Sequence, residues 1–108
     1  MFYEKDEKGY ADVLPGVKRK TLVHGTNTLF TEFRLKAGHE LPMHSHPEEQ
    51  TGYLVSGAIR LTIGNEVREV RPGDCWCVPG NVPHGAMVSE DSVAIEVFSP
   101  VRNDYLPK

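Results

Sequence analysis

The sequence predicts an all-β protein, and three observations support this prediction. Ten glycines and eight prolines are spread along the 108 residues. They divide the chain into pieces of roughly 5 to 10 residues, a spacing typical of sandwiches and barrels. Several pieces alternate between apolar and polar residues, as half-buried strands do, and no segment has a convincing helical period. We therefore expect about eight to ten short strands in a closed or nearly closed β structure.

The first clear strand is predicted at residues 29 to 35. Along this segment Leu29, Phe33 and Leu35 share one face, whereas Glu32 and Arg34 lie on the other. Successive side chains of a strand point to opposite sides of a sheet. The apolar face is therefore expected to be buried.

A hairpin is predicted in the middle of the chain. Ile59, Leu61 and Ile63 line one face of the piece AIRLTIG, and residues 64 and 65, glycine and asparagine, follow it. Both residue types accept the positive φ of a tight turn. The segment VREV at 67 to 70 then provides the returning strand.

Two more strands are expected towards the C-terminus. Residues 71 to 74, RPGD, form a turn, and the short strand CWCV follows at 75 to 78. Val93, Ile95 and Val97 form a last apolar face. In the CWCV strand the two cysteines are expected to be small buried residues, and the tryptophan between them to lie in the core or a subunit interface.

Composition limits the classes of protein that fit. The length suits one domain, residues 1–108. The formal charge of −3 arises from scattered residues, and a nucleic-acid partner usually requires a clustered basic patch. No apolar run reaches the roughly 18 to 20 residues of a membrane span. The N-terminal MFYEKDEKGY lacks the apolar stretch of a signal peptide, so the cytoplasm is the expected location.

The segment HSHPEEQ, residues 44 to 50, suggests part of a metal site. On an extended segment His44 and His46 project to the same face, as two ligands of one ion must. Such a pair also occurs in surface loops, but residues 73 to 84, GDCWCVPGNVPH, support the metal interpretation. They form a turn, a short strand and a proline-rich bend that ends at His84.

A further ligand could come from Glu48, Glu49 or Gln50. A strand that begins here places Gln50 on one face with Gly52 and Leu54, and places Glu49 on the opposite face. Parity therefore excludes Glu49 and Gln50 as joint ligands, but it does not choose between them.

The two stretches resemble the two conserved motifs of the cupin superfamily, at residues 38–57 and 73–88. The first motif falls on Gly38, His44, His46, Gln50 and Gly57, and the second on Gly73, Pro79 and His84. The second departs from the family pattern at Asn81, where glycine is usual, and at Val88, where asparagine is usual. The resemblance implies a single cupin domain, a small jelly-roll β-barrel with one metal ion held by His44, His46, Gln50 and His84. Glu48 and Glu49 are then expected to be solvated.

This ligand set has consequences for the metal. Three imidazoles and one amide carry no negative charge, so a divalent ion would keep its full charge and act as a strong Lewis acid. Three imidazoles suit Zn, Ni, Mn, Fe or Cu, and the affinity order does not select one of these transition metals.

The last strand contains a second candidate group, Glu96. If Val93, Ile95 and Val97 face one side, Glu96 lies with Ala94 and Phe98 on the other. That side could be an exposed outer face. If it is instead the interior of the barrel, a carboxylate near the metal could transfer protons.

The segments GVKRK at 16 to 20, HSHPEEQ, and FSPVRNDYL at 98 to 106 resemble the cupins of pectin and alginate breakdown. Those enzymes linearise 4,5-unsaturated uronates. Their active site contains an aspartate, a phenylalanine and an arginine on the last strand. Phe98 and Arg102 match, and Glu96 replaces the aspartate.

The resemblance implies that the metal and Arg102 hold the carboxylate of a small anionic sugar acid and an adjacent oxygen. Glu96 would transfer a proton, and Phe98 would pack against the sugar. It also implies a homodimer. Arg102 could instead pair with Asp104 at the surface. Two other functions fit the metal ligands. The chain could be a different metal cupin enzyme, such as a dioxygenase or an isomerase of sugars or keto acids. It could also be a non-catalytic binding protein.

Overall fold

Eight strands and one short 3-10 helix make up the fold, in a computed structural model that describes residues 1–107. The all-β prediction is confirmed, and the number of strands lies within the predicted range. The elements are β1 Ala11–Leu14, β2 Val17–His24, β3 Leu29–Leu35, β4 Glu40–His44, β5 Glu49–Ile63, β6 Glu66–Val70, β7 Cys75–Val78, β8 His84–Ser99 and the 3-10 helix Asn103–Tyr105.

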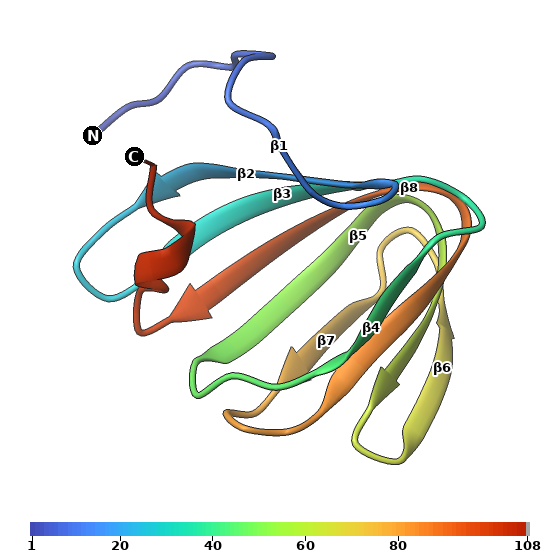
Figure 1. Cartoon of the computed structure of the whole chain (residues 1–108). Coiled ribbons are helices and arrows are strands. Elements are labelled where there is room, and N and C mark those ends of the chain that lie inside the picture. The colour runs from blue at the N-terminus through green and yellow to red at the C-terminus, as the bar shows by residue number, and fades with distance from the viewer. Residues whose placement is uncertain (108) are drawn as a thin grey trace.

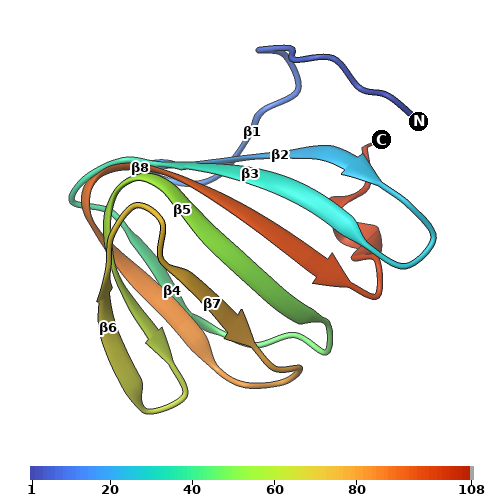
Figure 2. The ribbon, with the colours of Figure 1, turned by 180° about the vertical axis from the view of Figure 1, so that it is seen from behind.

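Two long strands, β5 and β8, hold the fold together. They pair antiparallel along their whole length, from Gln50 opposite Phe98 to Ile63 opposite His84. The first half of β5 and the second half of β8 lie in one layer with β7, β3, β2 and β1. Their other halves lie in a second layer with β4 and β6. Figures 1 and 2 show the two layers folded over each other, as in a jelly roll.

The bend between the layers lies near Gly57. The pairing of β5 with β8 shifts register between Leu54 and Ile59, and Gly57 has a φ of 91°. A Cβ atom here would collide with the backbone oxygen of Asp91 and with the side chain of Ser92. Gly57 is the last residue of the first motif, but β5 does not end there. Gly57 bends β5 instead, because β8 remains as a partner on both sides of it.

Alternation along the strands builds the core. The predicted inner face of β3 is confirmed, since Leu29, Phe33 and Leu35 are buried. On β8 the inward residues include Ala94 and Phe98, whereas the apolar face at 93, 95 and 97 lies on the half-buried outer side. The predicted hairpin is also confirmed, with β5 and β6 joined at residues 64 and 65.

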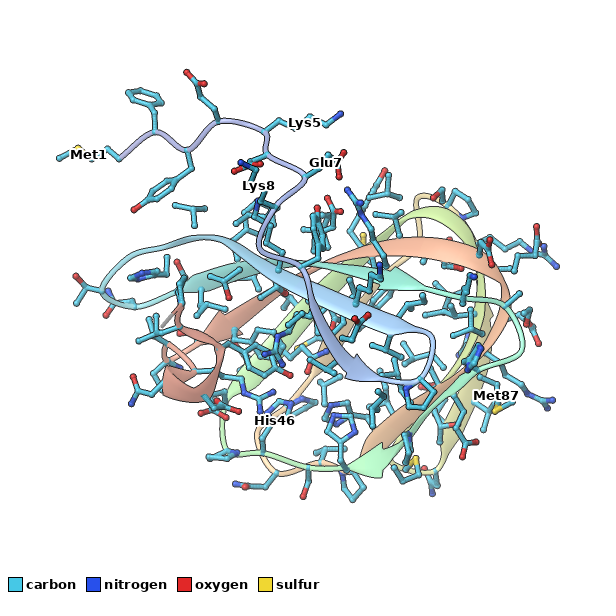
Figure 3. All side chains as sticks on the ribbon, turned by 45° about the horizontal axis from the view of Figure 1, so that its top comes forward. Met1, Lys5, Glu7, Lys8, His46 and Met87 are labelled. Atoms are coloured by element: carbon cyan, nitrogen blue, oxygen red, sulfur yellow. The ribbon has the colours of Figure 1, made fainter. Side chains whose placement is uncertain are left out.

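The C-terminal segment closes one end of the core. Val101, Tyr105 and Leu106 pack against the buried residues, and the hydroxyl of Thr21 donates a 2.5 Å hydrogen bond to the backbone oxygen of Tyr105. Both termini lie on the same side of the molecule (Figure 1), and the labelled residues from Met1 to Lys8 follow an arm that leads away from the sheets (Figure 3).

The expectation that the two cysteines are buried is wrong. Cys75 and Cys77 are both exposed and free, because the inward positions of β7 are taken by Trp76 and Val78. Within residues 1–107, no helix has the length and apolar character needed to cross a membrane.

We predict that Gly57→Ala lowers the free energy of unfolding by at least about 1 to 2 kcal/mol, because alanine disfavours the left-handed conformation and its methyl group meets the backbone of β8. Gly25→Ala is the matched control. Its Cβ would meet no atom within 4 Å, so this substitution should stabilise the fold by up to about 1 kcal/mol. Urea unfolding measures both effects, and equal stability of the two variants would contradict the assigned role of Gly57.

Candidate metal centre

Three histidines converge between the two layers. His44 ends β4 and lies directly opposite His84 at the start of β8, while His46 follows in the next loop. The ring centroids of His44 and His84 are 4.2 Å apart, and those of His46 and His84 are 4.9 Å apart. One nitrogen from each ring lies within 4.8 Å of the other two, so the three residues could hold a metal ion.

The hydrogen bonds of these rings determine which nitrogen is available. The Nδ1 atoms of His44, His46 and His84 lie 2.8, 3.0 and 2.9 Å from backbone oxygens, those of residues 42, 48 and 82. A carbonyl oxygen only accepts, so each Nδ1 carries the proton and each Nε2 keeps a lone pair. Metal-binding histidines are usually oriented in this way.

The buried rings are suited to stay neutral. Burial lowers the pKa of His46 and of His84 below the ordinary histidine value. Among the described residues the Nε2 of His84 is a buried polar atom with no hydrogen-bond partner. A buried unpaired lone pair is costly, and a cation bound at this position would satisfy it. The residues therefore fit a divalent metal.

Gln50 lies beside the three histidines. Its side chain is buried, and its Oε1 lies 3.0 Å from the Nε2 of His46. With the proton of His46 on Nδ1, both of these atoms are acceptors and cannot hydrogen-bond to each other. A cation between them would interact favourably with both. Glu49 is exposed on the opposite face of β5, as parity requires.

Glu48 lies closer to the site than expected. Its side chain is only 18% exposed, and its Oε1 lies 3.6 Å from the Nδ1 of His46 and 3.9 Å from the Nε of Arg102. The expectation of a solvated carboxylate is therefore wrong for Glu48. The loop after Pro47 turns this side chain back towards the ring, which strand parity does not describe.

Glu96 points into the interior beside Gln50. The Nε2 of Gln50 donates to its Oε2 at 2.5 Å, and the Nε1 of Trp76 donates to its Oε1 at 2.8 Å. Burial raises the pKa of Glu96 to about 7, although both hydrogen bonds oppose the rise. The carboxylate thus turns the amide of Gln50 so that its oxygen faces His46.

Trp76 was not identified from the sequence as a site residue. Trp76, Gly52 and Glu96 lie side by side on three neighbouring strands and face inward. A Cβ atom at Gly52 would collide with the indole ring, so the absence of a side chain lets Trp76 cross β5 and reach Glu96. A glycine at an inward position of a strand was the available signal.

A cavity of about 340 Å³ opens beside the histidines. Most of its lining is apolar, and its polar lining includes His44, His84, Gln50, Trp76, Glu96, Arg19 and Tyr105. Phe98 also lines it and packs edge-on against His46, at 5.6 Å between centroids. Figure 3 shows His46 among the side chains of the interior, in contrast to Met87 at the periphery.

Arg102 is not among the residues that line this cavity. Its Nη2 lies 2.9 Å from an oxygen of Asp104, the pairing that the sequence left open. Its guanidinium stacks on the ring of Tyr105, 3.8 Å from the centroid. It therefore contacts Tyr105, a lining residue, without lining the cavity itself.

The two motifs are joined by a backbone hydrogen bond. Asn81 has a φ of 66°, the left-handed conformation for which the family uses glycine, and asparagine tolerates it. Its backbone N–H donates to the carbonyl of His46 at 2.8 Å. The departure from the motif at Asn81 therefore preserves the turn that leads to His84.

Comparisons with known proteins agree with this structure. The cupin domain pattern matches residues 31–99. The chain is 28% identical to the pectin degradation protein KdgF of Dickeya dadantii, over 97% of each protein. It is 34% identical to the solved KdgF of Halomonas sp., with a TM-score of 0.92 and 98% of each chain covered. An RmlC-like cupin from Shewanella frigidimarina is 26% identical, with a TM-score of 0.91 over 98% and 96% of the two chains.

Another relative is the oxalate decarboxylase OxdC of Bacillus subtilis. It is 31% identical over 60% of this chain but only 18% of its own length. The two KdgF proteins, in contrast, align with nearly the whole of this chain, and the Halomonas structure shares its fold. The chain therefore belongs to the cupin family and is a KdgF-like cupin.

Proposed function

We propose that this chain is a metal-dependent enzyme that converts a 4,5-unsaturated uronate monosaccharide into its linear keto form during pectin or alginate breakdown. The observation that carries the proposal is the buried carboxylate of Glu96, which lines the same cavity as His44 and His84 and is linked to His46 through Gln50. The alignment with a pectin degradation protein over nearly the whole chain supports the substrate class.

The proposed ligands of the metal are His44, His46, Gln50 and His84. A bound Zn, Ni, Mn or Fe ion would supply Lewis acidity towards substrate oxygens. The chain's own contribution is to keep the three rings in one tautomer through backbone carbonyls and to orient Gln50 through Glu96.

The proposed reaction is an isomerisation that requires proton transfer. The C1–O5 bond of the sugar breaks as the C1 hydroxyl loses its proton and O5 gains one, so that an aldehyde and an enol result. The enol becomes a ketone when its hydroxyl proton leaves and C4 gains a proton. Glu96 is the group placed to carry protons between these atoms, because its carboxylate is buried in the wall of the cavity and held by two donors.

The other two proposed site residues shape the cavity. Phe98 presents an apolar surface next to His46 on which a sugar ring can pack. Arg102 stacks on Tyr105, and release from Asp104 would free its guanidinium for the substrate oxygen adjacent to the carboxylate. This exchange of partners would connect the C-terminal segment to substrate binding.

We also propose that the chain forms a homodimer through the outer face of its larger layer. Tyr53 and Val55 are about half exposed there, at 47% and 48%, and Tyr53 lies beside the half-buried Ile95. An apolar patch on an outer sheet face is typical of a protein contact, and twofold pairing is the commonest symmetry.

Sedimentation equilibrium should therefore give twice the mass of the chain. Tyr53→Glu should shift the protein towards the monomer, because it places a charge in the apolar contact. Asn65→Glu, in the exposed turn after β5, is the control and should leave the dimer intact. A wild-type monomer would refute the dimer.

Removal of one proposed ligand should weaken metal binding. His84→Ala should lower the affinity for Zn²⁺ or Ni²⁺ by more than the roughly 10- to 100-fold cost of losing a residue that only supports a ligand. His24→Ala, an exposed histidine, should bind like the wild type. Calorimetry on chelator-treated protein measures both. In addition, metal should raise the melting temperature of the wild type far more than that of His84→Ala. Equal affinities in the two variants would contradict the site.

The activity itself is tested with unsaturated galacturonate, whose ultraviolet absorbance should fall faster with the protein than without it. Glu96→Gln should slow the reaction by roughly 10²- to 10⁴-fold, as expected for a general acid–base group, and Arg102→Ala should also slow it. Both variants should retain metal. Glu90→Gln is the control, because Glu90 lies exposed on the same strand.

Three results would contradict the proposed reaction. The wild type could accelerate nothing, or an iron-loaded protein could consume oxygen, as a dioxygenase would. Stoichiometric binding of the uronate without turnover would instead indicate a binding protein.

A further inference from the structure

Arg19 reaches the cavity from β2. It lies on the same face of the strand as the buried Val17 and pairs in register with the buried Phe33 of β3. Because alternate residues of a strand share a face, its side chain enters the interior. Arg19 accordingly lines the cavity that also contains Trp76 and Glu96.

The charge of Arg19 has no acidic partner among residues 1–107. In residues 1–107 no carboxylate lies within ion-pair distance of its guanidinium, whereas Arg34 on the outer side of the same layer pairs with Glu7 and Glu32. The guanidinium carbon of Arg19 lies 3.6 Å from the centroid of the Tyr105 ring. Stacking on an aromatic face holds the plane of the group and leaves its edge donors available.

The cavity itself contains no spare acid for Arg19. Among the residues that line it, Glu96 is the one carboxylate, and both of its oxygens accept hydrogen bonds from Gln50 and Trp76. An arginine that faces a mostly apolar cavity without a counter-charge lacks the partner that such a group requires. An anionic ligand in the cavity would provide it.

Arg19 and Arg102 stack on the same ring but differ in charge balance. Arg102 is held by Asp104 through two nitrogens, at 2.9 and 3.3 Å. Arg19 has no such partner and lines the cavity directly. Tyr105 therefore supports one guanidinium that is already engaged and one that is available.

We infer that Arg19 is a specificity-determining residue that binds the carboxylate of a sugar acid in the cavity. Its planar fork suits a carboxylate in a bidentate contact. This inference rests on the proposed function for the substrate class, and it explains how the cavity would distinguish a uronate from the corresponding neutral sugar.

The test compares galacturonate, which lacks the reactive double bond, with galactose, which lacks the carboxylate. Calorimetry should show that the wild type binds galacturonate more tightly. Arg19→Met should lose about 10- to 150-fold of that affinity, the range expected for a charge-assisted hydrogen bond, and should bind galactose as the wild type does. Arg19→Lys keeps the charge without the planar fork, so its affinity for galacturonate should lie between those of the wild type and Arg19→Met. Lys18→Met, an exposed neighbour on the opposite face of β2, should have no effect.

Two results would overturn the inference. In one, the wild type shows no preference for galacturonate over galactose. In the other, Arg19→Met keeps this preference. Circular dichroism checks that each variant is folded, and Arg19→Gln replaces Arg19→Met if the latter is not. The proposed function fails separately. Absence of turnover on unsaturated galacturonate, with Arg19-dependent binding of galacturonate retained, would refute the reaction and leave the carboxylate site standing.

Discussion

The antiparallel pairing of β5 with β8 is the constraint on which the rest of the structure depends. These two strands cross from one layer to the other, so the same ladder of hydrogen bonds forms the core and the cavity. The register places Gln50 opposite Phe98 and Gly52 opposite Glu96. A slip of β5 by one residue would turn Gln50 to the outside, and a slip of β8 would do the same to Glu96. The pairing of β5 with β8 therefore fixes the positions of the proposed site residues as firmly as it fixes those of the core.

The distribution of charge around the histidines follows from this register. The residues nearest to the proposed metal position are neutral, and the carboxylates lie one contact further away. Glu96 is linked through the amide of Gln50, and Glu48 lies behind the ring of His46. An ion at this position would keep its charge towards a substrate, while Glu96 remains available for proton transfer. In the proposed reaction, the glutamine in the acidic position of the motif would separate the binding of metal from the transfer of protons.

The cavity depends on contacts that cross between distant segments. Trp76 reaches Glu96 over a glycine of the strand between them, and Tyr105 from the C-terminal segment closes the opposite wall. Arg19 and Arg102 then stack on this tyrosine from segments more than eighty residues apart. Such stacking needs three elements in place at once. The chemistry of the cavity is consequently a property of the assembled layers.

Local patterns predicted much of the fold and part of the site. The alternation in β3, the hairpin between β5 and β6, and the placement of Glu49 and Gln50 on opposite faces follow from residues that are close in sequence. The continuity of β5 through Gly57 was missed, because a glycine with positive φ can either end a strand or bend one. The exposure of the cysteines was missed for a different reason. Alternation shows that Trp76 and the two cysteines lie on opposite faces of β7, but it does not show which of these faces is the inner one.

The sequence by itself determined the all-β class, the spacing of His44 and His46, and the parity that separates Gln50 from Glu49. These depend on the period of a strand and on neighbours a few residues away. Only the tertiary structure decided that Glu96 is buried against Gln50 and Trp76, that Arg102 pairs with Asp104, and that Arg19 lines the cavity without a counter-charge. The physical reason is that burial and charge pairing depend on which distant side chains share a space, and that depends on how the two layers close over each other.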